Sequence, residues 1–131
     1  MDIFRIMELK FKGYCCSQII MQMGLEGLGK ENIELVDAMA GLCHGMHSGK
    51  TCGTLSAAFC LMYLADKRQA NTMCNELYDW FEELFGSTEC DILLEGNPLN
   101  KAVLCKEIVE GTYLRLVDMF EFYDIEFQRE K

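Results

Sequence analysis

Apolar residues recur every three or four positions along almost the whole chain, and a single proline, Pro98, interrupts it. This period is that of one face of an α-helix, and glycine or asparagine signals separate the segments. The sequence therefore predicts an all-α fold, a compact single-domain helical bundle of about five to six helices over residues 1–131. We expect helices at 3–12, 15–28, 33–42, 52–65, 69–85 and 101–123, and a short helical turn near 87–90.

Two of these helices indicate where the core lies. The segment 52–65 is apolar nearly all round, which predicts a central buried helix. The segment 101–123 carries one apolar stripe with Cys105 at its N-terminal end, so we expect Cys105 to point inward. Cys60 and Cys74 lie in the middle of expected helices among apolar residues, which favours a core position for both.

The chain is acidic, with 12 Lys and Arg against 21 Asp and Glu and a formal net charge of −9. This charge argues against nucleic acid and anionic membranes as partners. It suits a basic partner, such as an electron-transfer protein with a basic docking surface. The sequence shows no signal-peptide pattern and no apolar run of membrane-spanning length. We therefore expect a cytoplasmic protein without membrane insertion, and the high apolar content favours a homodimer.

Eight cysteines occur in the chain, and no two of them form a Cys-x-x-Cys pair. In the cytoplasm such a set indicates metal ligands or redox thiols rather than a disulfide framework. The missing pair argues against a zinc ribbon, a ferredoxin-type loop or a thioredoxin motif. Four of the cysteines fall in or near the first turns of expected helices: Cys16, Cys52, Cys90 and Cys105.

The placement of Cys52 predicts an unusually acidic thiol. Thr51 is the expected N-cap of the central helix, Cys52 is the first helical residue, and Lys50 precedes both. The partial positive charge of a helix N-terminus and a nearby ammonium group both favour thiolate over thiol.

Four thiolates support two kinds of chemistry. They are a complete ligand set for structural zinc or a common iron–sulfur cluster, or they can form two redox pairs. Because the four are widely separated in sequence, a shared site requires that several helices begin at the same end of the bundle. The complete ligand set slightly favours a metal centre, and disulfide cycling without metal is the close alternative.

The four cysteines and their neighbours resemble a known family. The segments that carry the resemblance are Tyr14-Cys15-Cys16-Ser17-Gln18, Thr51-Cys52-Gly53, Gly86-Ser87-Thr88-Glu89-Cys90 and Leu104-Cys105-Lys106-Glu107-Ile108-Val109. Their order is similar to that of the C-GCAxxG-C-C family of putative redox-active proteins, over nearly the whole chain. The resemblance implies a small redox-active or cofactor-binding protein with four signature cysteines. Thr54 stands where the pattern has alanine, and Ala57 where it has a second glycine.

The candidate metal ligands, which would be redox thiols if the site cycles through disulfides, are Cys16, Cys52, Cys90 and Cys105. The cofactor would then be an iron–sulfur cluster or another thiolate-bound metal. Cys15 points about 100° away from Cys16 on a helix, so we expect only Cys16 at the site. A second cluster before Cys52, formed by Cys43, His44 and His47, offers additional ligands, although a merely solvated loop is the simpler interpretation.

Several function classes stay open from the sequence. The leading hypothesis is a redox protein whose four cysteines converge on a metal or iron–sulfur centre for electron transfer. The alternatives are a thiol/disulfide redox protein without metal and a non-catalytic acidic helical binding module with buried structural cysteines. An enzyme with Cys52 as nucleophile and His44 or His47 as base ranks last, because no third orienting residue can be named.

Overall fold

The computed structural model describes residues 2–128, without the side chains of residues 98, 101 and 102. Within this range the seven α-helices are α1 (Asp2–Phe11), α2 (Cys16–Leu28), α3 (Ile33–Ala38), α4 (Gly53–Ala65), α5 (Ala70–Phe85), α6 (Cys90–Leu93) and α7 (Lys101–Phe122). The shorter helical segments are two 3-10 turns, η1 (Met39–Leu42) and η3 (Pro98–Asn100), and one π-helical turn, η2 (Gly45–Gly49). The all-α prediction is confirmed.

Local sequence signals set several helix ends. Cys15 is extended and precedes α2, and its backbone N–H donates to the Gln18 side-chain oxygen at 3.1 Å. The side-chain oxygen of Asn32 accepts the Leu35 backbone N–H at 3.0 Å and caps α3. Gly29 ends α2 in the left-handed conformation, with φ of 72°, which glycine adopts without steric cost. These caps satisfy backbone groups that a helix leaves without partners at its ends.

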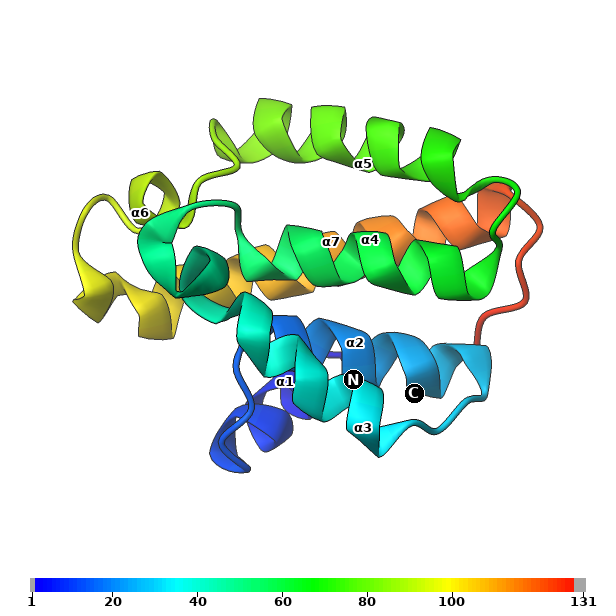
Figure 1. The fold of residues 1–131 in the computed structure, drawn as a ribbon, viewed down its shortest axis with the longest axis horizontal. Helices are drawn as coiled ribbons and strands as arrows, with labels where there is room; N and C mark the ends of the chain where they lie inside the picture. Colours follow the sequence, from blue (N-terminus) through cyan, green and yellow to red (C-terminus); the bar gives the residue numbers. More distant parts are fainter. Residues whose placement is uncertain (1, 129–131) are drawn as a thin grey trace.

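α4 is the central helix of the bundle, as the sequence predicted. It contacts α2, α5 and α7, and Figure 1 shows α5 on one side of it and α2 with α3 on the other. Leu55 and Leu61 of α4 are fully buried. A Cβ on Gly24 would collide with the Leu61 side chain, so glycine allows α2 and α4 to pack closely. No helix within residues 2–128 combines the length and the apolar character that spanning a membrane requires.

Two expectations about the helices are wrong in part. The segment 33–42 is α-helical only to Ala38 and continues as the 3-10 turn η1. Cys60 is exposed, whereas Cys74 is buried as expected, with its sulfur 3.7 Å from that of Met62. Because α4 is apolar on all sides, its sequence does not show which side the neighbouring helices leave exposed. Cys60 lies on the exposed side.

Candidate functional site

The candidate site lies where several helices begin. Figure 1 shows the starts of α2, α4 and α7 at the same end of the bundle, next to the single turn of α6. Cys16 is the first residue of α2, Cys52 is the N-cap of α4, and Cys90 is the first residue of α6. Cys105 lies in the second turn of α7. The common start of these helices thus brings distant cysteines to one end of the molecule.

Cys105 interacts with the other three of these cysteines. Its side chain is hydrogen-bonded to that of Cys16, and negative charge on Cys16, Cys52 or Cys90 opposes the ionisation of the Cys105 thiol. Its pKa lies far above the ordinary value, first because of the hydrogen bond to Cys16, then because of burial and of these charges. Cys16, Cys52 and Cys90 are buried, and Cys105 is half-buried. We call these four residues the thiol cluster.

The expectation of an acidic Cys52 is wrong. Burial, followed by the charge of Cys16, raises the pKa of the Cys52 thiol to about 11. The backbone N–H groups of Leu55 and Thr54 act in the opposite direction, as expected at a helix N-terminus. Removal of the thiol from water outweighs them, because the charged form loses more solvation than these dipoles restore. The thiol is therefore protonated at neutral pH.

Two backbone hydrogen bonds hold Cys52 beside Cys90. The N–H of Cys52 donates to the carbonyl of Thr88 at 2.8 Å, and the N–H of Cys90 donates to the carbonyl of Lys50 at 2.6 Å. Thr51 was the expected N-cap of α4, but it lies outside the helix and pairs with Glu89 in an isolated bridge. Cys52 itself is the N-cap. The bridge joins the entrance of α4 to that of α6.

Gly53, which follows Cys52 in the signature, has a packing role. A Cβ at this position would lie 2.6 Å from the carbonyl oxygen of Leu42 in η1. A carbonyl of the main chain cannot rotate away as a flexible side chain would. The absence of a side chain at Gly53 thus lets η1 approach the first turn of α4 next to Cys52.

Sequence reasoning missed the disulfide between Cys15 and Cys43, whose Cα atoms are 6.2 Å apart. The hydroxyl of Ser17 donates to the carbonyl of Met39 at 2.7 Å and lies 3.1 Å from the Cys43 sulfur. Adjacent residues of a helix point about 100° apart, so Cys15 and Cys16 were expected to face different neighbours. This difference in direction was the sequence signal that Cys15 has a partner of its own. In the disulfide, Cys43 has no thiolate to offer as the additional metal ligand considered above.

The two histidines of the second cluster have different surroundings. His44 lies against the thiol cluster, with Nδ1 3.7 Å from the Cys90 sulfur and Nε2 3.7 Å from Oδ1 of Asp91. His47 is exposed, and its Nε2 is 3.0 Å from the carbonyl oxygen of Ala40. The structure therefore brings His44, but not His47, to the candidate site.

A pocket of about 360 Å³ gives access to part of the thiol cluster. Cys16 and Cys105 line it, together with residues of α1, α2 and α7. Cys52 and Cys90 are not among the lining residues, and both are buried. A small molecule in the pocket would thus meet Cys16 and Cys105 first. Among residues 2–128, no three His, Cys, Asp or Glu side chains form a group that could hold a metal ion.

The comparisons with known proteins agree with the arrangement of the cysteines. Residues 14–119 match the family described as putative redox-active protein (C_GCAxxG_C_C). The matched range contains all four residues of the thiol cluster, and α1 lies before it. No match was found among curated proteins or among solved structures. The chain therefore belongs to the C_GCAxxG_C_C family of putative redox-active proteins.

Proposed function

We propose that Cys16 and Cys105 form a redox-active dithiol that cycles to a disulfide. The observation that carries the proposal is the hydrogen bond between their side chains, which come from α2 and α7 and meet at the pocket wall. The family description supports the coarser statement that the protein is redox-active. Contact between two sulfurs is the first requirement for a bond between them.

The hydrogen bond also assigns a role to each sulfur. Loss of the Cys105 proton would remove the hydrogen bond to Cys16, and the resulting charge would face three other cysteines. Cys105 therefore keeps its proton, and its thiol donates to the Cys16 sulfur. Cys16 is then the attacking thiolate, and Cys105 is the thiol that closes the disulfide. Oxidation removes two electrons and the one proton that Cys105 carries, and reduction returns them.

Disulfide mapping in glutathione buffers of increasing potential tests the proposal. Trypsin releases Cys16 in peptide 13–30 and Cys105 in peptide 102–106. We expect a disulfide between these two peptides to appear and disappear reversibly with the potential. Cys16→Ser should abolish it, and Cys60→Ser, at an exposed position outside the cluster, should leave it unchanged. If Cys105 remained a free thiol at every potential, as shown by its complete alkylation after denaturation, the proposal would be contradicted and the binding module with structural cysteines favoured.

A metal centre on the thiol cluster is the second candidate function. The observation that favours it is that ionisation of Cys16, Cys52 or Cys90 raises the pKa of Cys105, because a bound cation would relieve the repulsion among the thiolates. Four thiols suit zinc or an iron–sulfur cluster in kind and number, and such a cluster would supply one-electron transfer. The described side chains do not gather three ligands around one point, however, so no step is assigned to a metal.

Anaerobic purification separates the two candidates. A cluster protein would contain iron and sulfide in stoichiometric amounts and absorb visible light, and Cys90→Ser would remove both the metal and the colour. The dithiol proposal expects Cys90→Ser to leave the reversible Cys16–Cys105 disulfide in place. We place the dithiol in the cytoplasm, where thiols are kept reduced, and an electron-transfer protein or a second copy of the chain stays a predicted partner.

A further inference from the structure

The pocket beside the thiol cluster has an unusual charge for this chain. The whole sequence carries 21 Asp and Glu against 12 Lys and Arg. The described residues that line the pocket nevertheless include Lys10 and Lys106 and no aspartate or glutamate. The two lysine ammonium groups attract an anionic ligand to this pocket, whereas the acidic remainder of the surface repels it.

The remaining lining is mostly apolar side chains and cysteine sulfurs, with Gly13 and Tyr14 beside them. Ile6, Ile19 and Val109 line the pocket from α1, α2 and α7. Lys106 follows Cys105 directly on α7, and both side chains are half-buried. A ligand whose anionic group met the lysines could therefore extend along apolar surface toward Cys16 and Cys105. The volume of about 360 Å³ is that of a pocket for a small molecule.

We propose that this pocket binds a small disulfide that carries carboxylate groups and serves as the oxidant of the Cys16–Cys105 pair. The proposal rests on the proposed function and adds the substrate class to it. The lysines bind the carboxylates, the apolar walls contact the carbon chain, and the ligand disulfide lies at the two sulfurs. These three contacts need one molecule with an anionic end, an apolar body and a reducible sulfur–sulfur bond.

The reaction is an exchange of disulfides. The Cys16 thiolate attacks one ligand sulfur, which forms a mixed disulfide, and the other half of the ligand leaves as a thiolate and takes up a proton. Cys105 then gives up its proton and attacks the Cys16 sulfur. This step forms the Cys16–Cys105 disulfide and releases the second half of the ligand as a thiol. One ligand disulfide is thus reduced to two thiols, and one protein dithiol is oxidised.

Three disulfides of similar size and different charge test the proposal: dithiodipropionate (anionic), bis(2-hydroxyethyl) disulfide (neutral) and cystamine (cationic). The fully reduced, full-length chain is mixed with each, and formation of the Cys16–Cys105 disulfide is followed by quenching and mass spectrometry. Each rate is divided by the rate of the same disulfide with a dithiol in free solution, which removes differences in chemical reactivity. We expect dithiodipropionate to exceed the other two by about tenfold after this correction.

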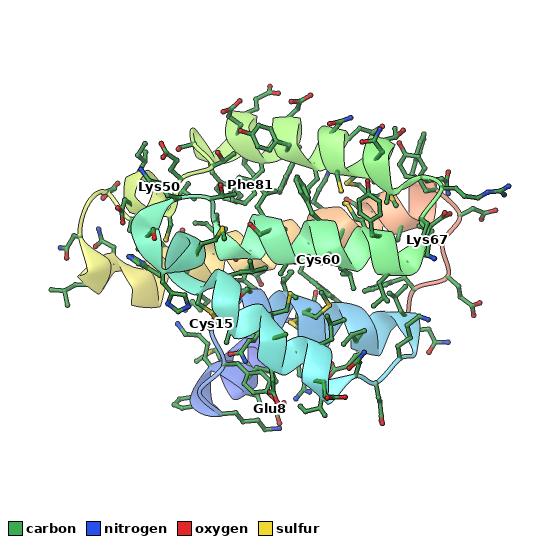
Figure 2. All side chains as sticks on the ribbon, viewed as in Figure 1. Glu8, Cys15, Lys50, Cys60, Lys67 and Phe81 are labelled. Carbon is green, nitrogen blue, oxygen red and sulfur yellow. A yellow bond between two sulfur atoms is a disulfide. The ribbon has the colours of Figure 1, made fainter. Side chains whose placement is uncertain are left out.

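Charge-removing variants locate the effect. Lys10→Gln combined with Lys106→Gln should abolish the preference for dithiodipropionate, measured as the ratio of its corrected rate to that of the neutral disulfide in the same variant. Lys67→Gln is the matched control, because Lys67 is exposed and Figure 2 shows it far from Cys15 and the pocket. Circular dichroism verifies that the variants fold.

The outcomes separate this inference from the proposed function. Equal corrected rates for the three disulfides, or a preference that survives the double lysine substitution, would overturn the pocket proposal and leave the dithiol in place. Failure of all three disulfides to produce the Cys16–Cys105 bond would overturn the dithiol and the pocket proposal with it. Cys15 also lines the pocket and shares tryptic peptide 13–30 with Cys16. Loss of the bond in Cys16→Ser would therefore show that Cys105 is joined to Cys16 and not to Cys15.

Discussion

Cysteines occupy two regions of the bundle with different surroundings. At the end where α2, α4 and α7 begin, Cys16, Cys52 and Cys90 raise the pKa of Cys105. In the middle of α4 and α5, Cys60 is exposed and Cys74 packs against Met62. Burial, followed by the charge of Cys60, raises the pKa of Cys74 to about 11, the same value as that of Cys52. A raised pKa therefore does not distinguish the two regions, whereas the hydrogen bond between the Cys16 and Cys105 side chains does.

The difference comes from how helices pack. Helices that run side by side bring their starts together at one end, so residues near several N-termini share a small volume. Residues in the middle of a helix meet only the flank of a neighbour, where packing requires apolar contact. The same amino acid thus lies among other thiols at a helix start and among apolar side chains in the middle of a helix.

The largest expected effect concerns the link beside the thiol cluster. Cys15→Ser with Cys43→Ser opens a disulfide that spans 28 residues of sequence. Closing a loop of this length restricts the unfolded chain, so we expect the free energy of unfolding to fall by about 3 to 4 kcal/mol. Urea denaturation of the oxidised proteins measures the change. An unchanged midpoint would show that this bond contributes no stability to the thiol end.

A slightly smaller loss is expected at the apolar centre. Leu61 is fully buried between α4 and α2, and Leu61→Ala should lower the free energy of unfolding by about 3 kcal/mol through the cavity that it leaves. Leu64→Ala, at a side chain that is 39% exposed, is the control and should cost much less. The rate at which Cys105 is alkylated in native protein should not change. A faster rate would mean that the two regions are mechanically coupled.

Alkylation rates sharpen the contrast between the thiols. The pKa of Cys52 rises from 9.0 to about 11, which lowers its thiolate fraction at pH 7 about 100-fold. Native Cys52 should therefore react with iodoacetamide at least that much more slowly than Cys52 in the unfolded chain, and its burial should also make it slower than exposed Cys60, as assigned by fragment ions of peptide 51–67. Comparable rates would contradict the burial of Cys52.

The pH dependence of stability follows from the same shift. Folding raises the pKa of Cys52, so the protonated thiol stabilises the fold below about pH 9, and this contribution is lost between about pH 9 and about pH 11. Urea midpoints measured across this range should fall less steeply in Cys52→Ser than in the wild type.

The smallest effects are expected at the two cysteines in the middle of helices. Cys60→Ala should change the free energy of unfolding by less than about 0.5 kcal/mol, because its side chain is exposed. Cys74→Ala should lower it by about 1 kcal/mol, because it removes a buried sulfur that contacts Met62. Neither change should alter the Cys16–Cys105 disulfide. Loss of that disulfide in either variant would extend the redox site beyond the thiol cluster.

Local signals were enough to predict most of the fold. The period of apolar residues and caps such as Gly29 depend on neighbours in sequence, and they placed the helices within a few residues of their observed bounds. The inward position of Cys105 also followed from its stripe. These properties belong to single helices, so the sequence of each segment contains them.

The errors concern properties that depend on distant residues. The disulfide joins Cys43 to Cys15, which lies 28 residues away in sequence, and the loop after Cys43 contains His44, Met46 and His47 in left-handed conformations that no periodic pattern predicts. The raised pKa of Cys52 comes from burial beneath segments that are far away in sequence. Local sequence shows the dipole at a helix start, but it does not show how much water the fold removes.

The bridge between the entrances of α4 and α6 separates architecture from chemistry. Its two hydrogen bonds are made by the backbone groups of positions 52 and 90, so any amino acid except proline can form them. A chain could therefore lose or replace a sulfur at either position and keep the loops that carry it. The number of thiols at this end can thus change, by evolution or by design, while the backbone link between the two loops remains.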